Sequence, residues 1–158
     1  MKILLVEDHT LFREGMTHLL RVIDATVQMD AAADCVEALK NLRDRTYDLV
    51  LLDLKLPGVQ GLDALTTLRK AAPSTPIVAL SGEEDPDVVY RVVEAGAMGF
   101  IPKSSTSDVL IQAMRLVLAK GIYLPPSALN FTRSDRAPPV VADRNAARPT
   151  EHPWASWI

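Results

Sequence analysis

Short apolar runs alternate with segments of helical periodicity up to about residue 124. Three of these runs, 3–6, 49–52 and 77–80, contain apolar residues alone. Continuous apolar runs of this length are typical of strands that are covered on both faces of a parallel sheet. Residues 26–29 and 99–101 are weaker strand candidates.

Between these runs, apolar residues recur every three or four positions, which predicts amphipathic helices. Asp34 is a plausible N-cap for the second helix, and Thr106 or Ser107 stands near the start of the last. The apolar stripes are Phe12, Met16, Leu19, Leu20 and Ile23; Val36, Leu39 and Leu42; Leu62, Leu65 and Leu68; Val88, Val89, Val92 and Val93; and Val109, Leu110, Ala113, Met114, Val117 and Leu118. Five successive βα units predict an α/β fold in which right-handed crossovers place helices on both faces of a parallel sheet.

Composition narrows the class of protein. The chain has 158 residues, 48% hydrophobic and 23% charged, which is ordinary for one globular domain. A single Cys excludes an intramolecular disulfide, and three widely separated His residues lack metal-ligand spacing. No apolar run reaches the length of a membrane span or a signal-peptide core, so we expect a cytoplasmic protein. A net charge of -3 gives no general reason to expect nucleic-acid binding.

The character of the chain changes near its end. Residues 125–158 hold 6 of the 11 Pro residues, four Arg against three acidic residues, and no periodicity. We therefore divide the chain into a domain, 1–122, and a Pro- and Arg-containing tail or linker remnant, 123–158. Trp154 and Trp157 could dock this tail on a groove, or the tail could be an accidental extension; both interpretations stay open.

Polar side chains follow four of the predicted strands. Glu7 and Asp8 follow the first strand, Asp53 the third, Ser81 the fourth and Lys103 the fifth. Because binding sites of open parallel sheets lie outside the carboxyl ends of the strands, we expect these side chains to converge. Asp53 is the most informative, since a charge that directly follows four buried apolar residues is costly unless it is compensated.

Such a cluster is suited to phosphoryl chemistry. Three carboxylates close together need a cation to stay ionised, and all-oxygen ligands favour Mg²⁺ or a similar hard ion such as Mn²⁺. A carboxylate beside such an ion can attack a phosphoryl group. Lys103 and Ser81 could then hold two of the phosphoryl oxygens, which is most of what phosphoryl transfer needs.

Four segments, 5–9 (LVEDH), 51–58 (LLDLKLPG), 79–82 (ALSG) and 99–103 (GFIPK), resemble the receiver domain of bacterial two-component response regulators. The sequence of 99–104, and of the residues after the last helix, is most similar to the NarL/FixJ-type subgroup. The resemblance implies a flavodoxin-like, doubly wound five-stranded sheet in the order 2-1-3-4-5, an order for which a receiver protein is a standard example. It also implies phosphorylation of the protein by a sensor histidine kinase or a phosphotransfer protein.

The resemblance also assigns roles to individual residues. Asp53 would be the phospho-acceptor, and Mg²⁺ would be held by Asp8, Asp53, the backbone carbonyl of Lys55 and, through water, Glu7. On phosphorylation the Ser81 hydroxyl would move towards the phosphoryl group and the ring of Phe100 would turn inward, a bistable element biased by a local charge.

Several residues near the acceptor depart from the family pattern or allow two interpretations. Many receivers have Pro directly after the Lys; here Ser104 stands there, and a cis bond before a non-proline residue costs about 2.5–4 kcal/mol.

Lys55 and Glu83 lie two residues after Asp53 and Ser81. They could pair across the mouth of the site and hinder hydrolysis, or be two solvated loop charges. We expect His9 to face solvent at a helix start.

The expected output is protein–protein contact. The helix at 109–118 is apolar nearly all round, which favours a phosphorylation-dependent homodimer or another protein partner. Residues 125–158 are too few for the LuxR-type DNA-binding domain that normally follows in this subgroup, so we expect no direct DNA binding by this chain and no membrane contact. The chain is then no enzyme beyond Mg²⁺-dependent self-phosphorylation and autodephosphorylation.

Three alternative functions fit parts of the sequence. The chain could be a truncated NarL/FixJ-type transcriptional regulator. It could be a phosphatase with an Asp nucleophile, although Lys55 stands where such enzymes have a second Asp. A flavodoxin-like cofactor module has the same architecture, but Glu7 and Asp8 would repel its phosphate.

Overall fold

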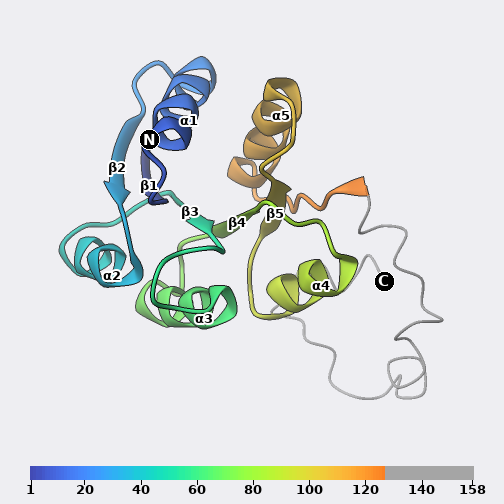
Figure 1. Cartoon of the computed structure of the whole chain (residues 1–158). Coiled ribbons are helices and arrows are strands. Elements are labelled where there is room, and N and C mark those ends of the chain that lie inside the picture. The colour runs from blue at the N-terminus through green and yellow to red at the C-terminus, as the bar shows by residue number, and fades with distance from the viewer. Residues whose placement is uncertain (127–158) are drawn as a thin grey trace.

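The computed structural model describes residues 1–126, and in this range five parallel strands alternate with five helices. Figure 1 shows the strands joined in one sheet, in the order β2-β1-β3-β4-β5. The elements are β1 (Lys2–Val6), α1 (Thr10–Ile23), β2 (Gln28–Ala32), α2 (Cys35–Asp44), β3 (Leu49–Asp53), α3 (Gly61–Ala71), β4 (Ile77–Ser81), α4 (Pro86–Glu94), β5 (Gly99–Pro102) and α5 (Ser107–Leu118). The predicted fold class and strand order are confirmed.

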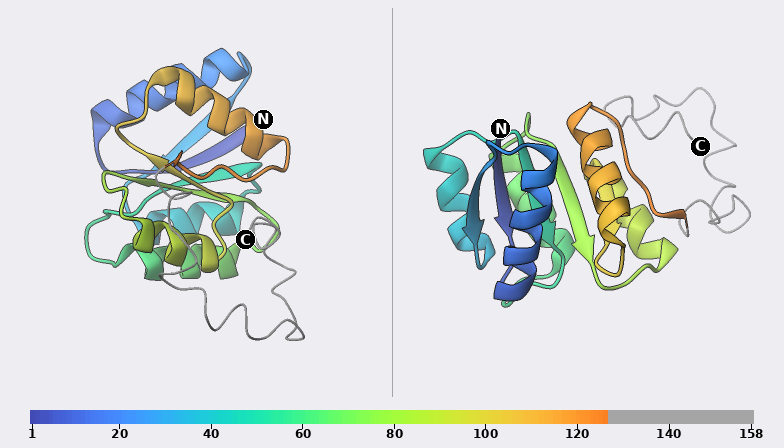
Figure 2. Two further views of the ribbon diagram at one scale, coloured as in Figure 1. Left: turned by 90° about the vertical axis from the view of Figure 1, so that its right-hand side faces the viewer. Right: turned by 90° about the horizontal axis from the view of Figure 1, so that it is seen from above.

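The molecule has three layers, with the sheet in the middle. Figures 1 and 2 show α1 and α5 on one face of the sheet and α2, α3 and α4 on the other. Alternate residues of the central strands serve the two faces: Leu4 and Val6 pack with α2, α3 and α4, while Ile3 and Leu5 pack with α1 and α5. Both faces are therefore apolar, which explains why the strands read as continuous apolar runs.

Two helix starts agree with their predicted caps. The Asp34 carboxylate accepts a hydrogen bond from the Glu37 N–H at 2.8 Å, and the Thr106 hydroxyl accepts one from the Val109 N–H at 3.3 Å. Each satisfies a backbone donor that the first turn of a helix leaves without a partner.

The second strand lies later than the predicted range 26–29. Residues before Gln28 form a turn instead, in which Asp24 Oδ1 accepts hydrogen bonds from the N–H and hydroxyl of Thr26, at 2.9 and 2.7 Å. The β-branched residues Thr26 and Val27 suggested a strand, but the side-chain hydrogen bonds of Asp24 hold the chain in the turn. The strand then extends through Asp30 to Ala32, although the polar Asp30 weakened its sequence signal.

The packed region continues past the predicted boundary at residue 122. After α5 the chain returns to β5, where the Tyr123 carbonyl accepts a hydrogen bond from the Phe100 N–H at 3.0 Å. Leu124 packs against the core on the α2, α3 and α4 face. Residues 127–158, which include both Trp residues of the predicted tail, lie outside the described range. None of the helices within residues 1–126 is long and apolar enough to cross a membrane.

A buried phenol ties the edge strand β2 to the end of α2. The Tyr47 hydroxyl donates a 2.6 Å hydrogen bond to Asp30 Oδ2, which Arg45 also contacts at 2.7 Å. Burial and the neighbouring Asp30 carboxylate raise the pKa of Tyr47 to about 12. Hydrogen bonds from Tyr47 and Arg45 outweigh burial and lower the pKa of Asp30.

We expect Tyr47→Phe to lower the free energy of unfolding by about 0.5–1.5 kcal/mol at neutral pH, because one hydrogen bond to Asp30 is lost. The pKa of Tyr47 is higher in the folded than in the unfolded chain, so its contribution is complete below pH 10 and declines as the pH rises towards 12. Urea unfolding at pH 7, 10 and 11 should show the difference between wild type and variant shrinking. A difference that stays constant would contradict this account.

Candidate functional site

The site lies where the direction of strand addition reverses. The chain leaves β1 towards β2 on one side, and later adds β3, β4 and β5 on the other. Helices that follow β1 and β3 lie on opposite faces of the sheet, so the carboxyl ends of these two neighbouring strands are the point at which open α/β sheets bind their ligands. Glu7, Asp8 and Asp53 stand at this point.

The acidic residues form one compact cluster. Carboxylate oxygens of Glu7, Asp8 and Asp53, together with a ring nitrogen of His9, lie within 4.8 Å of one another. Glu7 is 0% and Asp53 1% exposed, whereas Asp8 is exposed. Two buried carboxylates so close together must be compensated by positive charge.

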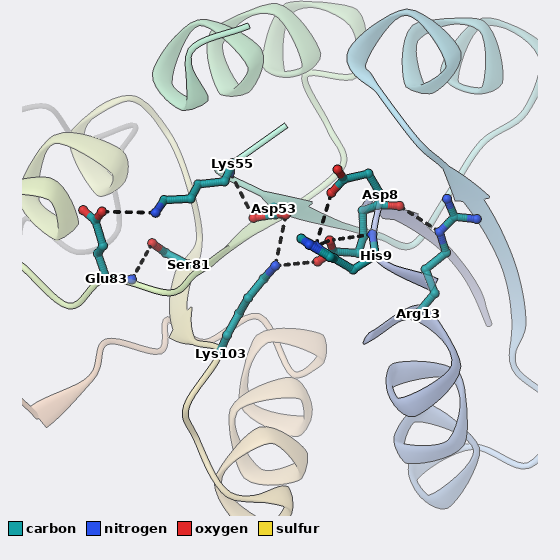
Figure 3. A network of polar contacts seen from close by, with 9 residues as sticks. Asp8, His9, Arg13, Asp53, Lys55, Ser81, Glu83 and Lys103 are labelled. Atoms are coloured by element: carbon teal, nitrogen blue, oxygen red, sulfur yellow. Dashed lines mark hydrogen bonds and ion pairs between the residues drawn. The ribbon is translucent and has the colours of Figure 1, made fainter. Parts of the chain in front are cut away.

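Lys103 supplies part of that charge. Its Nζ lies 2.7 Å from Glu7 Oε1 and 3.0 Å from Asp53 Oδ2, as Figure 3 shows for Asp53. Its backbone N–H donates a 2.7 Å hydrogen bond to the Ser81 carbonyl, which fixes the base of the side chain beside β4. Lys103 follows β5, and its ammonium contacts the carboxylates at the ends of β1 and β3.

The three charges shift one another's pKa values. For Asp53, burial and the Glu7 carboxylate raise the pKa against the opposing effects of the Lys55 N–H and Lys103. Burial also disfavours the charged form of Glu7, but Lys103 and the His9 N–H outweigh it, so the pKa of Glu7 is lowered. Burial disfavours the charged form of Lys103 as well, but the two carboxylates outweigh it and raise the pKa of Lys103. The surroundings of Asp53 therefore disfavour its charged form on balance, whereas those of Glu7 favour it.

The oxygens of the site are of the kind that a hard cation binds. Within residues 1–126, Glu7 Oε1 and Asp53 Oδ2 are buried and meet Lys103 at ion-pair distance without accepting a hydrogen bond of normal geometry. Buried carboxylate oxygens in this condition, next to the accessible Asp8, fit a hard divalent cation with oxygen ligands. The residues present are therefore suitable for the predicted Mg²⁺.

Backbone hydrogen bonds orient the other carboxylate oxygens. The Lys55 N–H donates to Asp53 Oδ1 at 3.0 Å, and the His9 N–H donates to Glu7 Oε2 at 3.1 Å. These bonds turn Oδ2 of Asp53 and Oε1 of Glu7 towards Lys103. The sequence motif could not show this orientation, because it depends on the backbone of the loops.

Three contacts of α1 and its start were missed by sequence reasoning. Arg13 Nε donates a 2.8 Å hydrogen bond to the Glu7 carbonyl, and the ring of Phe12 lies beneath Lys103 Nζ, 4.7 Å from the centroid. His9 is 70% exposed, as expected, but its Nδ1 also lies 3.1 Å from Glu7 Oε2. Arg13 is a basic residue in the first turn of the helix that follows Glu7 and Asp8, and this position could have suggested its contact with the site. Phe12 gave no such signal, because its spacing is that of the apolar stripe.

The remaining predicted residues surround the cluster. Ser81 is 4% exposed and its hydroxyl accepts a hydrogen bond from the Glu83 N–H at 3.1 Å. Lys55 Nζ lies 3.4 Å from Glu83 Oε1, and Figure 3 shows this pair extending across the loops that follow β3 and β4. Phe100 is fully buried, and its part in a switch stays a prediction. All peptide bonds in the described range, including Lys103–Ser104, are trans.

Comparisons with known proteins agree on one family. The model of the response regulator receiver domain matches residues 3–115. The glycerol metabolism activator of Pseudomonas putida is 38% identical over 135 residues, which cover 84% of this chain and 61% of that protein. Response regulator GacA of Pseudomonas syringae pv. syringae (strain B728a) is 36% identical over 125 residues, 79% of this chain and 58% of that protein.

A solved structure gives the same result. The crystal structure of a LuxR family DNA-binding response regulator from Silicibacter pomeroyi has a TM-score of 0.72 and 38% sequence identity, and the match covers 80% of this chain and 98% of that chain. The chain spans about three fifths of the length of the two curated relatives named above. Since the family match runs from the first strand into the last helix, we conclude that this chain belongs to the response regulator receiver domain family.

Proposed function

We propose that Asp53 accepts a phosphoryl group from a sensor histidine kinase or a phosphotransfer protein, and that the change of charge switches the receiver to control a downstream partner. The observation that carries this proposal is the position of Lys103, whose ammonium faces a buried Asp53 carboxylate across 3.0 Å. A phosphoryl group on that carboxylate would keep its negative charge within reach of the same ammonium.

In the proposed reaction, an Asp53 carboxylate oxygen attacks phosphorus while the bond from phosphorus to the donor's leaving atom breaks. The product is an acyl phosphate, and the leaving atom keeps the electron pair. Lys103 stabilises the negative charge on the phosphoryl oxygens, and the Ser81 hydroxyl donates to one of them. When bound, Mg²⁺ (or Mn²⁺) would neutralise phosphoryl charge, held by Asp8, Asp53, the Lys55 carbonyl and, through water, Glu7.

The proposed switch uses Ser81 and Phe100. Ser81 ends β4 and Phe100 lies in β5, the strand paired with β4, so a movement at one can reach the other through the sheet. The Phe100 N–H is also bonded to the Tyr123 carbonyl, which links this strand to the segment after α5. We infer that the switch is read by a protein partner on the α4 to α5 side of the molecule.

Incubation with acetyl phosphate and Mg²⁺ tests the proposal. The wild-type chain should gain one phosphoryl group by mass, and excess EDTA should suppress the gain, because the acidic cluster then loses its cation. A chain that gains no phosphoryl group from acetyl phosphate, phosphoramidate or a phosphorylated kinase would contradict the proposal.

The Lys55–Glu83 pair offers a second test. We propose that it shields the acyl phosphate from water, since the pair connects the loops that follow Asp53 and Ser81. Lys55→Ala and Glu83→Ala should each shorten the half-life of the phosphoprotein, by roughly twofold to threefold, because exposed pairs contribute little energy. The exposed Glu84→Ala serves as the matched control. Half-lives equal to the wild type would show that the pair is two solvated charges.

Partners and setting complete the proposal. On α5, Val109 and Leu116 are 36% and 42% exposed, and we propose this surface for a phosphorylation-dependent homodimer. A cytoplasmic location would give access to a kinase.

The second candidate function, favoured by the longer relatives, is that this chain is the receiver part of a NarL/FixJ-type transcriptional regulator. A longer downstream reading frame would distinguish the two.

A further inference from the structure

The Lys103 ammonium has one neighbour that carries no formal charge. Besides Glu7 Oε1 and Asp53 Oδ2, Nζ lies over the ring face of Phe12, 4.7 Å from its centroid. This distance is within the range of about 6 Å for a cation attracted by the negative face of an aromatic ring. The side chain of Lys103 is 20% exposed, so the contact is partly shielded from water.

The ring itself is held in place. Phe12 lies in the first turn of α1 and packs against the core that α1 and α5 form on the sheet, together with Ile3, Leu5 and Ile101. It therefore stands on the opposite side of Lys103 from α2, α3 and α4. The core contacts restrict the movement of the Phe12 ring, so the ring offers a constant surface to the flexible side chain of Lys103.

The charged neighbours of Lys103 change during the proposed reaction, whereas the ring does not. A cation among the carboxylates would compete with the ammonium for Glu7 and Asp53, and phosphorylation would convert the Asp53 carboxylate into an acyl phosphate. The attraction of the ring for the ammonium depends on neither event. It thus persists in each state in which Lys103 must face the phosphoryl oxygens.

We propose that Phe12 is a positioning residue for Lys103, and that its ring face keeps the ammonium over the acceptor when the carboxylate contacts weaken. This inference rests on the proposed function for its kinetic part only. The ring–ammonium contact itself can be measured without any phosphoryl donor.

Three variants separate the contact from general packing. Phe12→Leu removes the ring face, and Phe12→Tyr keeps it. Leu19→Ala is the matched control, because Leu19 lies on the same helix and packs against the same core, away from the site. Urea unfolding would give the stability of each variant, so that rates are compared between chains that are folded.

The first measurement is the NMR resonance of the Lys103 Hε protons without donor. It should be shifted upfield by the ring current in the wild type, Phe12→Tyr and Leu19→Ala, and return to the usual lysine position in Phe12→Leu. The second is the rate of phosphorylation by acetyl phosphate with saturating Mg²⁺. Phe12→Leu should be slower by roughly threefold to tenfold, the range expected for a partly desolvated cation–ring contact, while Phe12→Tyr and Leu19→Ala stay near the wild-type rate.

An unshifted resonance in the wild type would overturn the contact, and equal slowing by Leu19→Ala at equal stability would overturn the positioning role. A shifted resonance with an unchanged Phe12→Leu rate would overturn the positioning role. A shifted resonance in a wild-type chain that no donor phosphorylates would instead reject the proposed function and leave the contact standing.

Discussion

Asp53→Asn is expected to abolish phosphorylation by acetyl phosphate, leaving no phosphoryl adduct at a donor concentration that converts most of the wild type. The amide lacks the nucleophilic carboxylate oxygen. The neighbouring Glu7 should not replace it as acceptor, because its carboxylate is fully buried and paired with Lys103. Mass spectrometry of the intact chain measures the adduct directly. Asp44→Asn is the matched control, because Asp44 is exposed and lies at the end of α2 rather than at a strand end.

The same substitution should leave the chain as stable as the wild type or more stable at neutral pH. Burial raises the pKa of Asp53 in the folded chain, so the stabilising effect of its uncharged form is present at low pH and lost as the pH rises. An uncharged amide should retain that effect at pH 7, and Lys103 would keep Glu7 as a partner. An adduct of normal size on a folded Asp53→Asn chain would show that another residue is the acceptor.

Lys103→Met is expected to lower the free energy of unfolding by about 3 kcal/mol at neutral pH. The substitution leaves Glu7 and Asp53 buried side by side without the ammonium, and an uncompensated buried charge costs about 3–5 kcal/mol. The lower end applies because Lys103 is 20% exposed. The exposed Lys70→Met, in the last turn of α3, is the matched control and should change stability by less than about 0.5 kcal/mol.

The loss should depend on pH in a defined direction. The pKa of Glu7 is lowered in the folded chain, so its contribution is present above the ordinary carboxyl pKa of about 4 and lost as the pH falls. The pKa of Lys103 is raised, so its contribution is present below 10.5 and lost above it. Urea unfolding should therefore show the largest difference between about pH 5 and 9, with partial recovery on adding Mg²⁺ or Asp53→Asn. A loss that neither treatment reduces would place the effect outside the acidic cluster.

The strand ends were predictable because each has a direct sequence signal. Continuous apolar runs predict buried parallel strands, and a polar residue directly after such a run is placed at the carboxyl edge by the chain alone. The amino-acid sequence is therefore enough to predict that Asp53 and Lys103 lie close together. The apolar pattern places the second strand too early, because a side-chain hydrogen bond of Asp24, rather than residue propensity, decides where the turn ends.

The contacts that α1 makes with the site could not be predicted in the same way. Phe12 has the periodicity of a core residue, and its contact with an ammonium depends on how far α1 reaches over the edge of the sheet. Arg13 reaches the Glu7 carbonyl only because the loop between β1 and α1 is short and turns back on itself. Such contacts follow from tertiary geometry, for which a single sequence has no periodic signal.

The candidate site takes one residue or pair from the end of each of four strands, and helices separate these strands in the sequence. No continuous peptide of the chain contains it. Phosphorylation and unfolding should therefore follow the same denaturant curve. The chain should lose its capacity to accept a phosphoryl group at the denaturant concentration at which the sheet unfolds. In a cell, a destabilised variant of this receiver would be silent in proportion to its unfolded fraction, whatever its active-site residues.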